Sequence, residues 1–275
     1  MKVQTARTPV KALVVATYVA MIAMNVLANV LPINGRTTGA VSDAYPNLFA
    51  PAGLTFAIWG VIYLLLGAHL LYQLGVLHGT NADLRVAETL GGLPRRAAME
   101  RVGVLFSVSS LVNVAWILSW HYDFILLSTV LLATMLVLLV LITRTIHGEE
   151  LSPRDRVFVR LPFSVYFGWL TVATIANITV WLVSVRWDGF GIAASTWATV
   201  IIAVGAAIGT AVIVRDRDIA YGIVLIWAYL GIWIKHTSSS GFRSAYPAVS
   251  ATALAGIAAF IVAGAAVTLQ RKRHR

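Results

Sequence analysis

The sequence predicts an all-α integral membrane protein with about eight transmembrane helices, and three observations support this fold class. Of 275 residues, 59% are hydrophobic and only 12% are charged, whereas a soluble domain carries about 25% charged residues. Apolar stretches of about 20 residues, the length that crosses a bilayer, recur along the whole chain. Most of the 21 Lys and Arg residues fall between these stretches. A chain with this pattern is solvated by lipid.

The predicted spans are continuous apolar runs without the period-two alternation of barrel strands, which favours helices. Each run is long enough to cross about 30 Å of hydrocarbon. The spans run over residues 10–32, 54–77, 101–120, 123–146, 157–184, 194–214, 218–235 and 247–270.

The first span follows Lys2, Arg7 and Lys11, as in a secretory signal peptide. Its apolar run of about 20 residues is longer than the hydrophobic core of a typical signal peptide. It also contains Asn25 and Asn29. We therefore expect a helix that is retained.

The distribution of positive charge predicts the topology. Seventeen Lys and Arg residues fall on the side of the N-terminus, and four fall on the other side, namely Arg36, Arg186, Lys235 and Arg243. Short cytoplasmic loops are enriched in Lys and Arg. We expect a multi-pass protein of the plasma (inner) membrane of the cell, with both termini in the cytoplasm.

Composition and motifs exclude several functions. Cysteine is absent, which excludes disulfides, thiolate metal sites and cysteine nucleophiles. The formal charge of +10 is explained by the loops, so nucleic acid is not an expected partner. The six His residues are scattered, and the sequence predicts no metal ligands and no catalytic residues. All Asp and Glu residues fall in predicted loops or at span ends, which argues against an ion-coupled pump.

Two connections are long. Residues 33–53 form a predicted outside loop rich in Gly and Pro, of a length that suits a lid or a ligand-access element. Residues 78–101 are polar and charged and are predicted to be a plain cytoplasmic loop. In the sixth span, Gly205 and Gly209 form a GxxxG pattern, which favours close helix packing.

Aromatic and amide side chains share helix faces inside the spans. Trp59 and Tyr63 are four residues apart, and Asn113 and Trp116 are three apart. In the fifth span, Pro162, Tyr166, Trp169 and Asn177 fall on one face. One interpretation is interfacial anchoring and interhelical hydrogen bonding. The other is a pocket for a flat, hydrophobic ligand, which needs stacking surface and few polar groups.

Three motifs occur in order along the first five spans: YPNLFAPAGLTFAIWGVIY at 45–63, LVNVAW at 111–116 and LPFSVYFGW at 161–169, continuing to Asn177. They resemble signatures of the tryptophan-rich sensory protein family (TspO/MBR), which includes the mitochondrial translocator protein. The chain departs from the family pattern in two places. The Trp-x-Pro-Pro turn is reduced to FAPA at 49–52, and three residues separate Pro162 from Tyr166.

The resemblance implies a five-helix TspO-like ligand-binding bundle in residues 1–185 and a three-helix membrane extension in residues 186–275. It implies a pocket inside the bundle for a porphyrin, another tetrapyrrole or a sterol-like lipid; no cofactor is certain from the sequence, and bound porphyrin or lipid is the candidate. Together with the aromatic faces, it predicts these ligand-binding residues: Trp59, Tyr63, Asn113, Trp116, Tyr166, Trp169 and Asn177.

The leading hypothesis is a sensor or transporter of such a ligand, with the lipid bilayer and the hydrophobic small molecule as partners. The alternatives are a membrane enzyme that modifies or degrades the ligand, with Trp59 involved, and a permease-like structural subunit. The absence of an acid–base pair in the spans favours a non-enzymatic role. The resemblance also implies a homodimer, but three added helices could cover the dimer surface, so the oligomer is left open.

The predicted topology is tested by reporter fusions. A reporter that is active only in the cytoplasm, fused to the C-terminus, is expected to be active, because both ends carry the excess of positive charge. A reporter that is active only outside the cytoplasm is expected to be silent there. The opposite result would place the C-terminus outside and contradict the topology.

Overall fold

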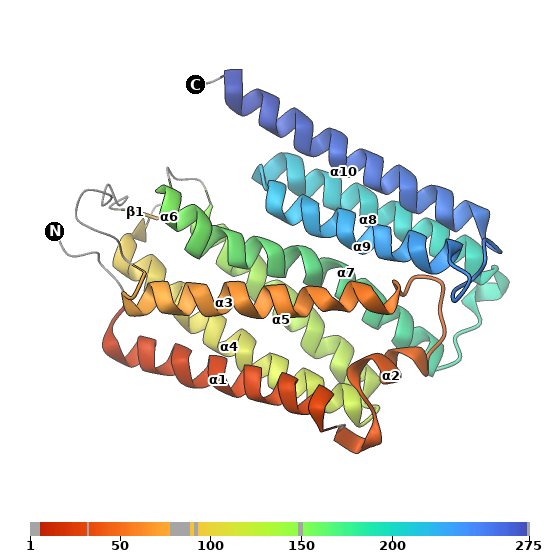
Figure 1. Ribbon diagram of the computed structural model, residues 1–275, viewed down its shortest axis with the longest axis horizontal. Helices are drawn as coiled ribbons and strands as arrows, with labels where there is room; N and C mark the ends of the chain where they lie inside the picture. The colour runs from red at the N-terminus through yellow and green to blue at the C-terminus, as the bar shows by residue number, and fades with distance from the viewer. Residues whose placement is uncertain (1–5, 32, 78–88, 91–92, 148–150, 274–275) are drawn as a thin grey trace. The chain divides into compact units, whose positions relative to one another are not determined.

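The computed structural model describes residues 6–31, 33–77, 89–90, 93–147 and 151–273. Within these ranges, eight helical segments are long and apolar enough to cross a membrane (Figure 1). They are Thr8–Val30, Gly53–Leu74, Arg95–His121, Ile125–Ile146, Pro153–Ser184, Ala194–Asp216, Ile219–Thr237 and Pro247–Arg271. The predicted fold class and the eight predicted spans are confirmed.

The long helices are α1 (Thr8–Val30), α3 (Ile58–Leu74), α4 (Arg95–His121), α5 (Ile125–Ile146), α7 (Leu161–Ser184), α8 (Ala194–Asp216), α9 (Ile219–Thr237) and α10 (Pro247–Arg273). The short elements are η1 (Ile33–Gly35), α2 (Thr38–Asp43), η2 (Gly53–Ala57), β1 (Thr89–Leu90), β2 (Leu93–Pro94), α6 (Pro153–Asp155), η4 (Arg156–Arg160) and η5 (Gly189–Gly191). Strands β1 and β2 pair in antiparallel orientation.

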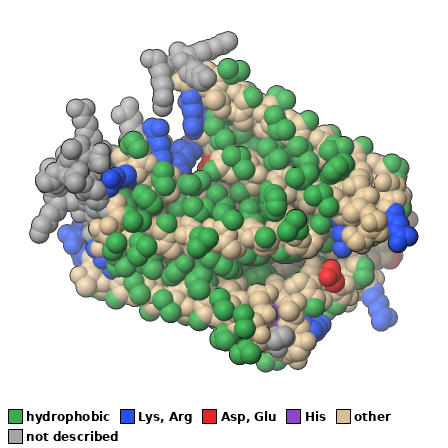
Figure 2. All heavy atoms as spheres, viewed as in Figure 1, with side chains coloured by type: hydrophobic (Ala, Val, Ile, Leu, Met, Phe, Trp, Pro, Cys, Tyr) green, Lys and Arg blue, Asp and Glu red, His purple; other side chains and the backbone are tan. Residues whose placement is uncertain are grey.

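Many large hydrophobic side chains are exposed. Leu64 is 78% exposed, and Val262 is 67% exposed. Figure 2 shows hydrophobic side chains spread across the viewed face of the molecule. Such a surface suits hydrocarbon better than water, because a soluble protein rarely exposes large contiguous apolar patches.

Two predicted loops are wrong in part. The 33–53 loop contains the short helices η1 and α2 and the first residue of η2. The loop predicted at 78–101 is shorter than expected, because β2 is followed directly by α4, which begins at Arg95. Residues 78–88 and 91–92 of this predicted loop lie outside the described residues. Hydropathy placed the start of this span at 101 because it counts Arg95 as a solvated charge, whereas a buried carboxylate pairs with it.

The chain forms two compact units, each described here by itself. Unit 1 comprises residues 1–37 and 59–167, and unit 2 comprises residues 38–58 and 168–275, each as far as it is described. The chain passes between them three times: at the start of α2, at the start of α3 and within α7. The predicted division at residue 185 stays a prediction.

In unit 1, helix α4 packs against both α1 and α5. A Cβ atom on Gly103 of α4 would lie 2.8 Å from Val10 Cγ1, so a larger residue there would push α1 away. A Cβ atom on Gly67 of α3 would lie 2.7 Å from the Tyr18 hydroxyl oxygen. That hydroxyl donates a hydrogen bond to the Tyr63 carbonyl over 2.9 Å. Small residues thus bring these helices close, as is usual where lipid supplies no hydrophobic driving force.

In unit 2, helix α10 packs against α8 and α9. A Cβ atom on Gly205 would lie 2.6 Å from the Tyr229 hydroxyl oxygen, and one on Gly209 would overlap Leu225 and Phe260. The predicted packing role of this GxxxG pair is therefore confirmed. The Tyr229 hydroxyl donates to the Ile202 carbonyl over 2.8 Å, which satisfies the one polar atom of this buried side chain.

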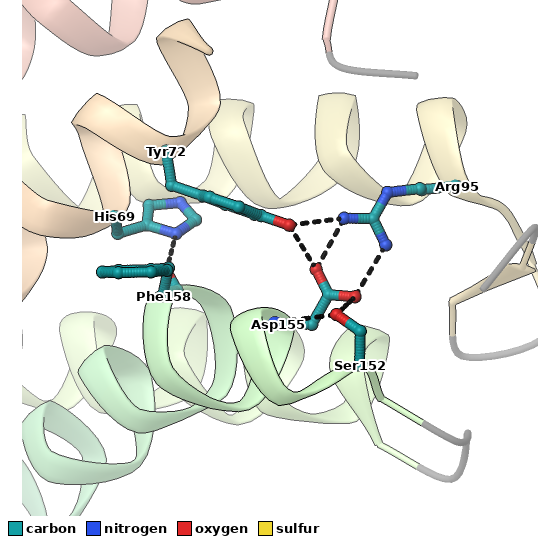
Figure 3. A network of polar contacts seen from close by, with 6 residues as sticks. All are labelled: His69, Tyr72, Arg95, Ser152, Asp155 and Phe158. Carbon is teal, nitrogen blue, oxygen red and sulfur yellow. Dashed lines mark hydrogen bonds and ion pairs between the residues drawn. The ribbon is translucent and has the colours of Figure 1, made fainter. Parts of the chain in front are cut away.

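A charged cluster, made of Tyr72, Arg95, Ser152 and Asp155, joins three segments of unit 1 (Figure 3). The Arg95 and Asp155 side chains are 3% and 0% exposed and form a two-pronged ion pair, with N–O distances of 2.6 and 3.0 Å. The Tyr72 hydroxyl donates to Asp155 Oδ1 over 3.0 Å, and Ser152 Oγ donates to Oδ2 over 2.8 Å. Almost every bonding position of the carboxylate is used, which offsets its desolvation.

Sequence reasoning missed this cluster, although one local signal was present. Ser152, Pro153 and Asp155 form a helix N-terminal signature, with Ser at the cap, Pro at the first position and an acid in the first turn. Ser152 Oγ accepts a hydrogen bond from the Asp155 backbone N–H over 3.1 Å, and the helical run then continues through η4 into α7. This signature places the helix start at 153 rather than at the predicted 157.

The charged cluster predicts a large stability difference between two substitutions. Asp155→Asn is expected to lower the free energy of unfolding by about 3–5 kcal/mol, because it leaves a buried guanidinium without its counter-charge. Glu100→Gln is the control: Glu100 pairs with Arg7 and Arg96, which are 66% and 54% exposed, and the loss of these exposed pairs is expected to cost under about 1 kcal/mol. Thermal unfolding of both purified variants in detergent measures the difference. Equal melting temperatures would show that the buried pair adds no stability.

Candidate functional site

Four of the predicted ligand-binding residues meet in unit 1. Trp59 lies at their centre, with its ring stacked on Tyr63 at 5.6 Å and on Trp116 at 5.7 Å between ring centroids. The Tyr166 ring meets Trp59 edge-on at 6.0 Å. These residues, here called the Trp59 cluster (Trp59, Tyr63, Trp116 and Tyr166), come from α3, α4 and α7. The i, i+4 spacing of Trp59 and Tyr63 puts both on one face of α3, which is why the sequence pattern predicted this contact.

Asn113 is the amide associated with this cluster. It is fully buried, and its Oδ1 accepts a hydrogen bond from Asn25 Nδ2 of α1 over 2.6 Å. The hydroxyls of Tyr63 and Tyr166 each interact with the Asn113 side chain. By geometry, Asn113 Nδ2 has no hydrogen-bond partner within the described part of the chain. A buried donor left without an acceptor costs about 1–3 kcal/mol, so an acceptor on a bound molecule would be favoured here.

Trp169 and Asn177 belong to unit 2. Trp169 is 1% exposed, and its ring meets Phe56 edge-on at 5.8 Å between centroids. Asn177 is 3% exposed. Both are buried as the helix pattern predicted, but their part in a ligand site stays a prediction.

Two further residues of unit 1 were missed as site candidates. Trp120 stacks on Trp116 at 6.3 Å and lengthens the aromatic surface by one turn of α4. Its i+4 spacing from Trp116 was a signal in the sequence. Asn25 positions Asn113 from 88 residues away. No local pattern pairs those two residues, because their contact depends on how α1 packs against α4.

The described residues contain no group of three or more His, Cys, Asp or Glu side chains arranged to hold a metal ion. His69 is fully buried, and its Nδ1 contacts the Phe158 carbonyl oxygen at 2.7 Å. Its ring packs against Phe163 at 4.8 Å between centroids (Figure 3 shows His69 beside Phe158). This histidine connects α3 to η4.

A protein-family profile described as TSPO-like protein matches residues 11–266. The chain belongs to this family. The match extends further than the three motifs, which end at residue 177, and it covers all of α8 and α9 and most of α10 of this TSPO-like protein. Neither the curated proteins nor the solved structures give a significant match to the chain. The resemblance read from the motifs is therefore confirmed at the level of the family.

The Asn25–Asn113 hydrogen bond predicts measurable coupling between α1 and α4. In a double-mutant cycle, Asn25→Ala and Asn113→Ala are expected to couple by about 0.6 kcal/mol and at most about 1.7 kcal/mol, the range of interhelical hydrogen bonds in membranes. Reversible unfolding in mixed micelles measures it.

Asn29→Ala supplies the control for this cycle, because Asn29 donates to the Asn25 carbonyl of its own helix over 2.9 Å. Its coupling to Asn113→Ala is expected to be near zero. If the Asn25 cycle shows no more coupling than the Asn29 cycle, the hydrogen bond does not hold the two helices together.

Proposed function

We propose that this TSPO-like membrane protein binds a hydrophobic aromatic ligand, a porphyrin or other tetrapyrrole or a sterol-like lipid, and acts as its sensor or transporter. The observation that carries the proposal is the buried Asn113 amide, which interacts with Tyr63 and Tyr166 of the Trp59 cluster and whose Nδ2 has no hydrogen-bond partner by geometry among the described residues. We assign ligand contacts to the Trp59 cluster and Asn113, and we retain Trp169 and Asn177 as proposed contacts.

The chemistry of these residues fits a flat ligand with a few acceptor atoms. Aromatic pairs contribute about 0.5–1.5 kcal/mol beyond the burial of area, and they prefer offset-stacked or edge-on geometry. A molecule that slides between Trp59 and Trp116 would exchange ring–ring contacts for ring–ligand contacts. The Asn113 amide and the Tyr63 and Tyr166 hydroxyls would supply hydrogen bonds that fix its orientation.

The membrane and topology form part of the proposal. The bilayer is the solvent of this multi-pass protein, and we propose the plasma membrane with both termini in the cytoplasm, because 17 of 21 Lys and Arg residues fall on that side. A homodimer stays a prediction.

The proposal predicts porphyrin binding that depends on two residues. When protoporphyrin is titrated with the purified protein, the Soret absorption band of the porphyrin is expected to shift. Because this signal comes from the porphyrin and not from tryptophan, it can be compared directly between wild type and Trp variants. Trp59→Phe and Asn113→Ala are each expected to weaken binding about tenfold, because each removes about 1.4 kcal/mol of stacking or hydrogen bonding.

The controls are Trp233→Phe and Asn29→Ala, which change the same residue types outside the proposed contacts. Unchanged affinity in both test variants would refute the site. Loss of the Soret band under illumination, abolished by Trp59→Phe, would instead identify an enzyme that degrades the ligand.

A further inference from the structure

A cavity lies within unit 2, at the end of α7 and the start of α8. Its volume is about 440 Å³, within the range of about 300–1,000 Å³ of small-molecule sites. Four segments line it: residues 46–49, the last turns of α7 with the following 187–192 turn, the first two turns of α8, and the connection between α9 and α10. None of the lining residues belongs to the Trp59 cluster.

The wall formed by residues 46–49 is built by local hydrogen bonds. Asn47 Oδ1 accepts from the backbone N–H groups of Phe49 and Ala50, over 3.0 and 2.8 Å. Phe49 is 1% exposed. The Leu48 carbonyl oxygen lies 2.9 Å from His236 Nε2 of α9. This wall is therefore preformed, which lowers the entropic cost of binding.

A second part of the lining is aromatic. The Trp187 and Trp197 rings lie 5.2 Å apart between centroids, and Trp197 Nε1 donates to the Gly189 carbonyl over 2.9 Å. Gly189 has φ +66°, and a Cβ atom there would lie 3.1 Å from Trp197 Nε1, so glycine permits this close contact. Phe242 and Tyr246 add a second, perpendicular ring pair at 5.5 Å. The walls thus offer several ring faces at once.

Asp188 is the one charged residue among the described residues that line the cavity. Its Oδ1 accepts a hydrogen bond from the Phe190 N–H over 3.0 Å. Asp188 is exposed, so its second carboxylate oxygen is open to solvent or to a ligand. The polar groups of three other lining side chains are already used: Thr179 donates to Ile175, Trp197 to Gly189, and Asn47 to Tyr45.

We propose that this cavity, the Asp188 cavity, binds a lipophilic cation, that is, an organic cation with an aromatic or alkyl body. A carboxylate beside Trp, Tyr and Phe rings attracts positive charge, because ring faces are negative and cation–π contacts contribute about 0.5–2 kcal/mol. Anionic ligands would meet a like charge. The apolar walls accept the body of the ligand.

The inference goes beyond the proposed function, because it concerns other residues and another class of ligand. Its test uses two probes of the same shape and opposite charge, tetraphenylphosphonium and tetraphenylborate, with the full chain in lipid nanodiscs. Equilibrium dialysis against empty nanodiscs removes partitioning into lipid. The phosphonium is expected to bind at one saturable site per chain, at least tenfold more tightly than the borate.

Asp188→Asn keeps the oxygen that caps Phe190 and removes the charge. It is expected to weaken phosphonium binding about tenfold and to leave porphyrin binding unchanged. Asp43→Asn, which changes an acid outside the cavity lining, is expected to leave both unchanged. Trp59→Phe is expected to leave phosphonium binding unchanged, so this site and the porphyrin site succeed or fail separately.

Two results would overturn the proposal: phosphonium affinity that survives Asp188→Asn at the wild-type value, or equal affinity for the two probes. A wild-type thermal unfolding curve and a monodisperse size-exclusion profile show that the Asp188→Asn variant is folded, so a loss of phosphonium binding there is assigned to the charge.

Discussion

The close approach between α9 and residues 46–57 holds the first segment of unit 2 against its helices. Gly231 makes it possible, because a Cβ atom there would overlap the Thr55 side chain. Three polar contacts fasten the segment: Ala52 N–H donates to the Gly231 carbonyl over 3.0 Å, Trp227 Nε1 donates to the Thr55 carbonyl over 3.0 Å, and His236 contacts the Leu48 carbonyl. The Gly- and Pro-rich loop is therefore anchored to a helix of the predicted extension, and this anchoring shapes one wall of the Asp188 cavity.

The same demand for satisfied polar groups organises unit 1. Lipid supplies no hydrogen bonds, so a buried charge persists only where the protein pairs it. Arg95 and Asp155 meet that demand together, with Tyr72 and Ser152 as further partners. Asn25 and Asn113 meet it in part, because one amide donor of Asn113 stays without a partner among the described residues. The Arg95–Asp155 pair contributes to stability, and the remaining Asn113 donor supports the proposed ligand contact.

The two aromatic sites differ in the polar group that accompanies the rings. The Trp59 cluster is paired with a neutral amide that offers a donor, whereas the aromatic walls of the Asp188 cavity are paired with a carboxylate. Ring faces alone accept many flat or apolar molecules, so the polar group decides which are preferred. The two proposals thus assign this TSPO-like chain two sites of opposite preference, one for ligands with acceptor atoms and one for cations.

The sequence by itself determined the helical membrane fold, the eight spans, the family and the shared faces of Trp59 with Tyr63 and of Asn113 with Trp116. Each of these follows from residues near one another in the chain, through hydropathy, helical spacing or a local motif. Only the tertiary structure decided that Arg95 meets Asp155, that Asn25 meets Asn113 and that residues 46–57 fasten to α9. These contacts join positions 60, 88 and 188 residues apart, and no local pattern encodes which distant partner satisfies a buried polar group.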